Sequence, residues 1–272
     1  MSEFASTRFG KGEPLVLLHG LGSSRQAWSP VLPALAKHFD VIALDLPGFG
    51  QTAPLPAGTE PTPRALAFAV AVALDDLGIS RPHLAGNSLG GWVALELAKI
   101  RPVRSVTLLS PAGLWRHHTP LYCRASLRLS RWAAGHATRL LNRLVSHSVG
   151  RILVLGQTHA HPTRMTPQQA SETIGAMGTC PGFDETLRAT TARRYLPDHP
   201  IQAPVTVAFG GRDLLLLPLQ SRQLGALPAG TTTAELPGCG HIPMSDDPAA
   251  VADLIQQSAA DAGTPTACLI DR

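Results

Sequence analysis

The stretch LAGNSLGGW, residues 84–92, decides the fold. It places Ser88 between two glycines, Gly86 and Gly90, each two positions away. An apolar run typical of a buried strand precedes it, and residues 89–100 have the spacing of a strong helix. A sharp turn from a strand into a helix lifts one side chain above the strand ends, which suits a nucleophile. The glycines are expected because side chains there would collide with adjoining backbone.

Similar short apolar runs recur along the chain and predict further buried strands. They fall at residues 15–18, 41–44, 83–85, 106–109 and 205–209, and we expect one more strand at about residues 232–236. Helical patterns occupy residues 25–38, 65–77 and 89–100, and prolines interrupt the first of them. Strands that alternate with helices predict an α/β fold with a mostly parallel central sheet and helices on both faces.

The alternation stops between residues 113 and 200, where helical patterns such as 121–144 appear without strands. This segment lies between two predicted strands, so we expect a helical cap above the strand ends, where open α/β sheets bind ligands. We expect the last helix to fray from about Ser258. The predicted organisation is a core at residues 1–112 and 201–260, a cap at 113–200 and a flexible tail at 261–272.

Composition excludes several classes of protein. With 44% apolar and 15% charged residues in a chain of 272, a compact globular protein is expected rather than a disordered one. No run of 18 apolar residues occurs, and residues 1–12 lack a signal-peptide core, so we expect a cytoplasmic protein without stable membrane insertion. The four cysteines form no C-x-x-C pair, and we expect no metal and no cofactor.

Positive charge is concentrated in the predicted cap. Residues 113–200 hold 11 arginines, no lysine and 4 acidic residues, a balance of +7 against +4 for the whole chain. A basic face attracts acidic substrates, anionic lipid or nucleic acid. Because arginine outnumbers lysine 20 to 3 throughout the chain, solvated arginines on a helical insertion are favoured. We expect a small-molecule substrate with an apolar acyl part and no nucleic acid, and the sequence leaves the oligomeric state open.

A serine hydroxyl is a poor nucleophile at neutral pH and needs a histidine base, which in turn needs a carboxylate to orient it. His241 lies in LPGCGHIP, a glycine-rich loop after the last predicted strand, and Asp213 lies in FGGRD, after the strand that follows the cap. The order Ser88, Asp213, His241 is the one expected of an α/β-hydrolase. The alternatives are a helix N-cap for Ser88, a loop histidine without a role and a turn aspartate. Asp45 in DLPGFG competes for the carboxylate role, but we expect it to fix a turn.

Four segments resemble the α/β-hydrolase fold superfamily in its capped form with a serine nucleophile. They are LLHGLGSS, ALDLPGFGQT, AGNSLGG, and GGRD together with GCGHIP, all in family order. The likeness covers residues 14–112 and 203–257, and the insertion matches only in position. Only about a dozen residues precede the first recognisable strand, which implies that the family's first antiparallel strands are shortened or missing.

The resemblance implies a role for each residue of the motifs. Ser88 is the expected nucleophile, His241 the general base and then acid, and Asp213 the orienting carboxylate. The backbone amides of Leu21 and Leu89 are expected to form the oxyanion hole. Further residues are expected to support these two loops, namely His19, Gly20, Gly22, Gly86 and Gly90. The apolar run 214–217 in the loop after Asp213 is expected to reach the cap or the substrate pocket.

These residues predict a serine hydrolase that cleaves a carboxylic ester or thioester through an acyl-enzyme. A carbon-carbon bond hydrolase acting on ring-cleavage products is an alternative, because related segments occur in that group. A binding protein, or a cyclase or epimerase, on the same scaffold is an alternative from another class, since fold does not determine function. Relatives with an aspartate nucleophile, the dehalogenases and epoxide hydrolases, are disfavoured because Ser88 occupies the nucleophile position.

Overall fold

The structure is a computed structural model and describes residues 4–262. Seven strands form one sheet in the order β1-β3-β2-β4-β5-β6-β7. Their bounds are β1 Ser6–Gly10, β2 Glu13–Leu18, β3 Phe39–Leu44, β4 His83–Asn87, β5 Val106–Leu109, β6 Val205–Gly210 and β7 Thr232–Leu236. Strand β1 pairs antiparallel with β3, and all other pairs are parallel. The predicted α/β class with a mostly parallel sheet is confirmed.

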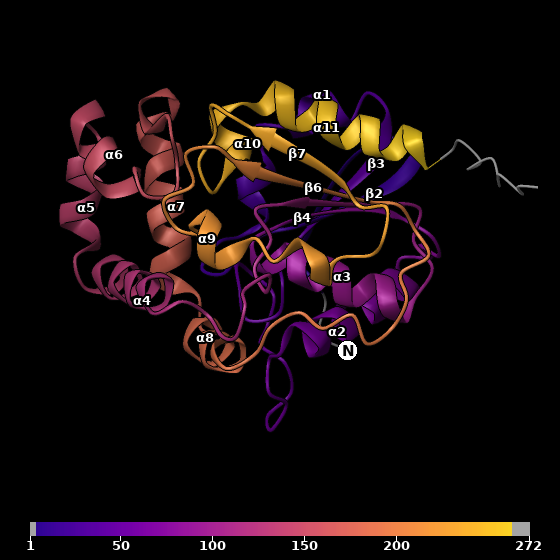
Figure 1. Ribbon diagram of the computed structural model, residues 1–272. Coiled ribbons are helices and arrows are strands. Elements are labelled where there is room, and N and C mark those ends of the chain that lie inside the picture. Colours follow the sequence, from indigo (N-terminus) through magenta and orange to yellow (C-terminus); the bar gives the residue numbers. More distant parts are fainter. Residues whose placement is uncertain (1–3, 263–272) are drawn as a thin grey trace, which may run out of the picture.

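Helices cover both faces of this sheet. Helices α1 and α11 lie over one face, and α2 and α3 lie over the other (Figure 1). The bounds of the helices beside the sheet are α1 Leu32–Leu35, α2 Pro63–Asp76, α3 Leu89–Ile100, α9 Pro218–Ser221, α10 Pro243–Asp246 and α11 Pro248–Asp261. In β2, Leu15 and Leu17 pack in one apolar cluster with residues of α1 and α11, whereas Val16 and Leu18 pack in another with residues of α2 and α3. A strand buried on both sides in this way reads as a continuous apolar run.

One element settles an open alternative, and two others differ from the prediction. The first antiparallel strands were expected to be shortened or missing; one of them is present as the five-residue β1, whose residues STRFG are mostly exposed at the sheet edge and carry no apolar run. Residues 25–38 form a 3-10 turn, Arg25–Trp28, and the four-residue helix α1 instead of one helix, since proline interrupts helical hydrogen bonding. Helix α11 does not fray at Ser258, which is buried, and continues to Asp261. Residues 263–272 of the expected tail lie outside the described residues.

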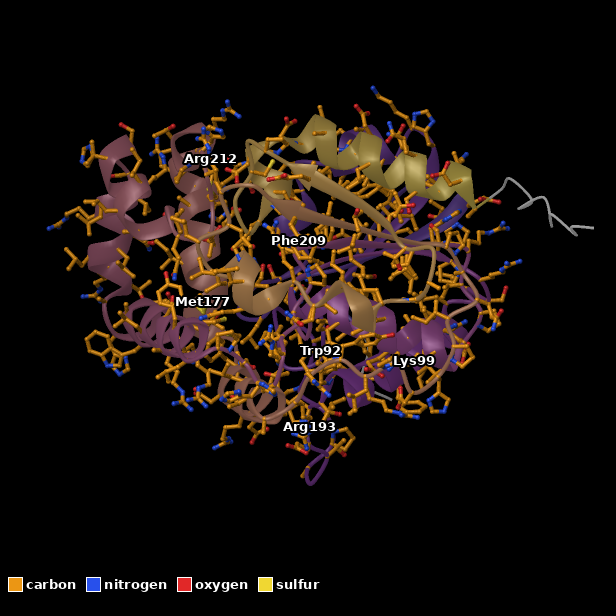
Figure 2. All side chains as sticks on the ribbon, viewed as in Figure 1. Trp92, Lys99, Met177, Arg193, Phe209 and Arg212 are labelled. Carbon is orange, nitrogen blue, oxygen red and sulfur yellow. The ribbon has the colours of Figure 1, made fainter. Side chains whose placement is uncertain are left out.

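Five helices lie between β5 and β6. They are α4 Leu121–His136, α5 Thr138–Val145, α6 Ser148–Leu155, α7 Pro167–Thr179 and α8 Phe183–Thr191. Helices α4 to α7 gather beside one end of the sheet (Figure 1), with Met177 among them and Trp92 in the neighbouring core (Figure 2). The helices bury a small apolar cluster of their own, which includes Val145, Met165 and Ile174. The division of the chain into core and cap stays a prediction.

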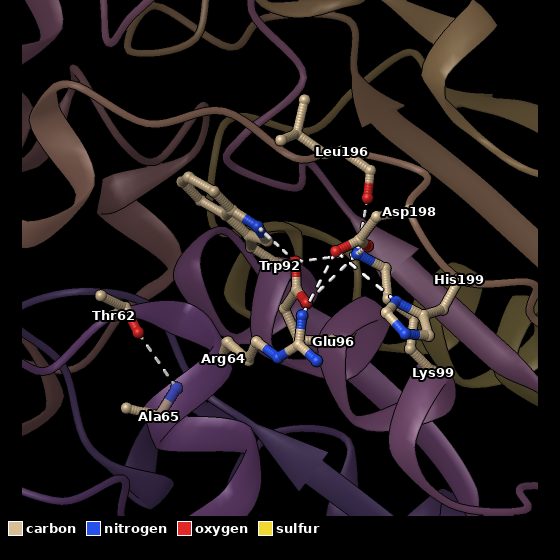
Figure 3. Close-up of polar contacts among 9 residues, drawn as sticks. All are labelled: Thr62, Arg64, Ala65, Trp92, Glu96, Lys99, Leu196, Asp198 and His199. Carbon is tan, nitrogen blue, oxygen red and sulfur yellow. Dashed lines mark hydrogen bonds and ion pairs between the residues drawn. The ribbon is translucent and has the colours of Figure 1, made fainter.

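Lys99 fixes the chain to α3 where it returns from α8 towards β6. Its ammonium group donates to the Leu196 carbonyl at 2.6 Å and to Asp198 Oδ1 at 2.7 Å (Figure 3). It also lies 3.1 Å from Glu96 Oε1 and over the ring of Tyr195, 4.3 Å from the centroid. The hydrogen bond from Lys99 lowers the pKa of Asp198 to about 2. The segment that leads into β6 is therefore held against the sheet-covering helix.

Candidate active site

Ser88 occupies the turn between β4 and α3 with strained backbone. Its φ of 54° and ψ of −116° lie in a region that residues other than glycine rarely adopt. Ser88 stands at the N-cap position of α3, but its side chain makes no capping hydrogen bond. The structure therefore does not support the alternative that the Ser88 side chain serves only to cap the helix. Strain of this kind persists only where the surrounding structure enforces it, and it clusters at functional sites.

Close backbone approaches explain the glycines around this turn. A Cβ on Gly86 would lie 2.3 Å from the Gly90 carbonyl oxygen, and a Cβ on Gly90 would lie 2.1 Å from the Leu18 carbonyl oxygen. Gly20, in the loop after β2, lies so close that a Cβ there would be 3.2 Å from the Ser88 Cβ. The turn is therefore as crowded as the sequence predicted. The loop after β2 also packs directly against Ser88.

His241 and Asp213 meet at the carboxyl ends of the last two strands. His241 Nδ1 lies 2.8 Å from Asp213 Oδ2, and both residues are buried. The other carboxylate oxygen, Oδ1, accepts hydrogen bonds from the amides of Leu215 and Leu216 at 2.9 and 2.8 Å. Burial raises the pKa of the Asp213 carboxyl, but the charge and hydrogen bond of His241 and the two amides together lower it further, so it lies below its ordinary value. Asp213 is thus an ionised carboxylate that fixes the His241 ring.

Asn87, directly before Ser88, connects the turn that carries Ser88 to the loop that carries His241. Its side-chain amide donates to the backbone carbonyl of His241 at 2.9 Å and to that of Leu109 at 3.0 Å. The sequence left Asn87 without a role, because its partner His241 lies 154 positions away in the chain. Its position next to Ser88 in the turn was the only available signal.

His19 and Asp45 hold neighbouring loops and do not enter the cavity. His19 Nδ1 lies 2.8 Å from the Gly20 carbonyl oxygen, and the Leu46 amide donates to Nε2 at 3.0 Å. This pattern assigns the proton to Nδ1, and burial lowers the pKa of His19 and keeps the ring neutral. Asp45 is buried, forms an ion pair with Arg25 and accepts from the Arg25 amide at 2.7 Å. Asp45 fixes its turn, as expected, and His19 connects the loops after β2 and β3.

One cavity of about 440 Å³ contains both Ser88 and His241 in its wall. Leu21 and Leu89, the residues whose amides were expected to bind an oxyanion, line it as well. Leu89 is the first residue of α3, so its amide has no acceptor within the helix. Gly22 of the same loop has a φ of 70° and packs so tightly that a Cβ would lie 2.5 Å from the Met177 sulfur of α7.

The cavity wall is apolar and carries little charge. Leu215 and Leu216 line it, which confirms that the apolar run after Asp213 reaches the pocket. Among the residues described, no lysine, arginine, aspartate or glutamate lines the cavity. Cys123 also lines it, and burial raises the pKa of its thiol to about 12, so it is neutral. Within residues 4–262, no group of three or more histidine, cysteine or acidic side chains is placed to hold a metal ion.

Asp246 ties the His241 loop to the helical segment. Its buried carboxylate accepts hydrogen bonds from the amides of Gly240 at 2.8 Å, Ala160 at 2.9 Å and His161 at 2.7 Å. The Ile242 amide donates to the Thr158 carbonyl at 2.9 Å. Sequence reasoning missed Asp246, because its partners come from a segment about 85 residues away in the chain.

Replacing Asp246 with alanine should strongly destabilise the fold. Three amides lose their acceptor: the hydrogen bond from Gly240 is buried, and those from Ala160 and His161 are partly buried. An unsatisfied buried group costs about 1–3 kcal/mol and a partly buried one less, so we expect the free energy of unfolding to fall by about 2–4 kcal/mol. Asp247→Ala is the control, because Asp247 accepts only from Ala250 at the start of α11, and loss of a helix cap costs about 1 kcal/mol. Urea unfolding of both variants checks the difference, and equal losses would contradict it.

A model of the alpha/beta hydrolase family matches residues 15–254. The chain belongs to this family. The match runs from within β2 into α11 and includes the helical segment between β5 and β6, and it confirms the resemblance stated from the motifs. It also confirms the prediction of a hydrolase enzyme.

Known relatives of this alpha/beta hydrolase have different activities. The chain is 32% identical over 190 residues to an epoxide hydrolase of Mycobacterium tuberculosis, covering 67% of this chain and 87% of that protein. It is 44% identical over 106 residues to the pimeloyl-[acyl-carrier protein] methyl ester esterase of Aeromonas hydrophila, covering 39% of this chain and 40% of the esterase. The solved structure of a thermophilic esterase from Thermogutta terrifontis matches with a TM-score of 0.74 at 20% identity, over 96% of this chain and 94% of that one. The last likeness shows the fold alone.

Proposed function

We propose that this alpha/beta hydrolase cleaves neutral carboxylic esters or thioesters through an acyl-enzyme formed on Ser88. The main support is the combination in one cavity of a serine on strained backbone and a histidine bound to a buried carboxylate. A serine needs this pair of partners to become nucleophilic at neutral pH. We further propose that residues 113–200 act as a cap over this site and that the protein is cytoplasmic.

In the proposed mechanism, Ser88 Oγ attacks the carbonyl carbon while His241 Nε2 takes its proton. Asp213 holds Nδ1–H and stabilises the imidazolium that forms. The amides of Leu21 and Leu89 donate to the oxyanion of the tetrahedral intermediate. Collapse of the intermediate expels the alcohol or thiol, which receives the proton from His241. A water molecule then attacks the acyl-enzyme with His241 as base, and the free acid and Ser88 are released.

The lining of the cavity favours ester cleavage over the carbon-carbon bond alternative. Burying a carboxylate without a cation is costly, and no arginine or lysine among the described residues lines the cavity. Ring-cleavage products carry negative charge, so their binding would need such a cation. Epoxide hydrolysis, the activity of the Mycobacterium relative, is not proposed, because that reaction uses an aspartate where this chain has Ser88.

A comparison of substrates tests the proposal. We expect p-nitrophenyl esters of neutral acids to be hydrolysed with kcat/KM at least about a hundredfold above that of an anionic ring-cleavage product, because a missing charge partner costs several kcal/mol. Esters with acyl chains of two to twelve carbons will show how much of the cavity is used. A preference for the ring-cleavage product would instead support carbon-carbon bond hydrolysis. Failure of a fluorophosphonate probe to label the folded protein would support the binding-protein alternative.

A further inference from the structure

Helices α4, α5 and α6 expose an unusual number of apolar side chains. Of the seventeen large apolar side chains exposed within residues 4–262, nine belong to these three helices. They are Leu121, Tyr122, Leu129, Trp132, Leu140, Leu144, Val149, Ile152 and Leu153. Large exposed apolar patches on a soluble domain mark surfaces that bind something. We call the exposed face of these three helices the α4–α6 surface.

The α4–α6 surface is also basic. Residues 121–155 contain six arginines and no lysine, aspartate or glutamate. Arg128, Arg139 and Arg143 are exposed, and the last two alternate with the exposed leucines of α5. Arg131 and Arg151 instead donate to backbone carbonyls within the helical segment. The same face therefore combines aliphatic and tryptophan side chains with uncompensated positive charge, which is the pattern of helices that lie at a membrane interface.

The cavity opens on this surface. Leu129 of α4 and Leu153 of α6 both line the cavity, yet 65% of Leu129 and 77% of Leu153 is exposed. These two side chains thus border a mouth of the cavity formed by residues of α4 and α6, two helices that lie beside one end of the sheet (Figure 1). An apolar substrate that reaches Ser88 through this mouth passes between apolar side chains.

We propose that the α4–α6 surface docks on the anionic surface of a lipid bilayer and takes up its apolar ester substrate from there. The arginines meet the lipid phosphates, while the leucines and Trp132 enter the interfacial region around the cavity mouth. No helix within the described residues is long and apolar enough to cross a membrane, so the contact is peripheral. The inference about substrate uptake rests on the proposed function, whereas the docking does not.

The charge and the apolar side chains of the α4–α6 surface favour a lipid bilayer over a second copy of the chain or a nucleic acid. A second copy of the chain would bring two basic faces together, because residues 121–155 hold no acidic side chain to pair with the arginines. Nucleic acid would satisfy the arginines but would leave most of the nine apolar side chains in water. An anionic lipid surface satisfies both kinds of side chain.

Trp132 supplies a direct optical readout. Of the four tryptophans, Trp28, Trp92 and Trp115 are buried, and Trp132 is 59% exposed. Its emission should move to shorter wavelength when it enters a bilayer interface. The Ser88→Ala protein is used for binding, so that the vesicles stay intact. It should bind vesicles of phosphatidylglycerol and phosphatidylcholine with this shift, should bind pure phosphatidylcholine vesicles at least tenfold more weakly, and should dissociate in about 0.5 M salt.

Two double variants test the surface. Arg139→Gln with Arg143→Gln should weaken vesicle binding at least about tenfold, since each arginine near an anionic surface contributes roughly fivefold. Trp132→Ser with Val149→Ser should weaken it similarly and remove the spectral shift. Phe68→Ser with Val72→Ser is the matched control, because these apolar side chains are also more than half exposed but lie on α2, and this variant should bind as the parent does. None of these residues lines the cavity, so hydrolysis of a dissolved ester should be unchanged.

Several results would overturn the docking proposal. Equal binding to anionic and neutral vesicles would do so, as would unchanged binding by the arginine variant. A dimer that the Trp132 and Val149 substitutions convert to monomer would show a self-association surface instead. Retention of duplex DNA without vesicle binding would show a nucleic-acid surface. If the Ser88→Ala protein binds the vesicles but no fluorophosphonate labels the parent protein with Ser88 intact, docking is supported and only the proposed function is overturned.

Discussion

Ser88→Ala should lower kcat on p-nitrophenyl esters by about 10⁴-fold or more and abolish labelling by a fluorophosphonate. In the proposed mechanism the side chain supplies the attacking oxygen, so its removal leaves only binding and the oxyanion donors. The fold should persist, because the Ser88 hydroxyl makes no capping hydrogen bond to α3 and alanine is smaller. Circular dichroism and a urea unfolding curve check that the loss is chemical.

Ser110 is the matched control for this experiment. It also has positive φ, 42°, is buried, and follows the neighbouring strand β5, but it does not line the cavity. Its hydroxyl accepts from the Gly210 amide at 3.4 Å. Ser110→Ala should therefore retain kcat within a few fold and lose at most about 1 kcal/mol of stability. If the two variants kept similar activity, Ser88 would not be the nucleophile.

Asp213→Asn should lower kcat by about 10³–10⁴-fold with little change in KM. The carboxylate accepts the His241 Nδ1 proton at 2.8 Å, and an amide there can present its NH₂ group and favour the wrong imidazole tautomer. In the proposed function the apolar wall binds the substrate, and the change leaves this wall in place. Steady-state kinetics with one neutral ester measures both constants.

Asp45→Asn separates this effect from the loss of any buried carboxylate. Asp45 is as buried as Asp213, but it pairs with Arg25 in a loop that does not line the cavity. Breaking a buried ion pair costs about 3 kcal/mol, so stability should fall while kcat at low temperature stays within a few fold. If Asp45→Asn lost kcat and Asp213→Asn kept it, Asp45 would be the carboxylate that serves His241, and Asp213 would have only a structural role.

Much of the core could be predicted because its signals are local. Buried strands such as Val106–Leu109 and Val205–Gly210 appear at the predicted positions to within one residue, since a strand covered on both faces must be apolar along its length. Strand β1 lies at the edge with most of its side chains in water, so no apolar pattern marks it. Site residues could also be predicted where they lie in a recognisable motif. The pairing of His241 with Asp213 is an example.

The remaining parts depend on contacts between distant segments. Asn87 lies in a motif that gave it no role, and Asp246 lies in none of the motifs. Their importance follows from which carbonyl or amide the fold brings to them. The packing of α4 to α8 likewise could not be predicted from the sequence. Where helices follow one another without strands between them, the sequence pattern does not say which helices lie side by side. Nothing in the sequence shows that Leu129 and Leu153 share one opening.

The Asp246 carboxylate limits how this chain can be remodelled. It joins residues 160 and 161 to Gly240, next to His241, so the helical segment and the histidine loop share one set of hydrogen bonds. The helical segment is therefore not an exchangeable module: a graft that replaces residues 113–200 and omits this short anchor would release the loop that carries His241. New specificity is better sought by changing the side chains between α4 and α6, where the wall borders solvent and no such anchor is disturbed.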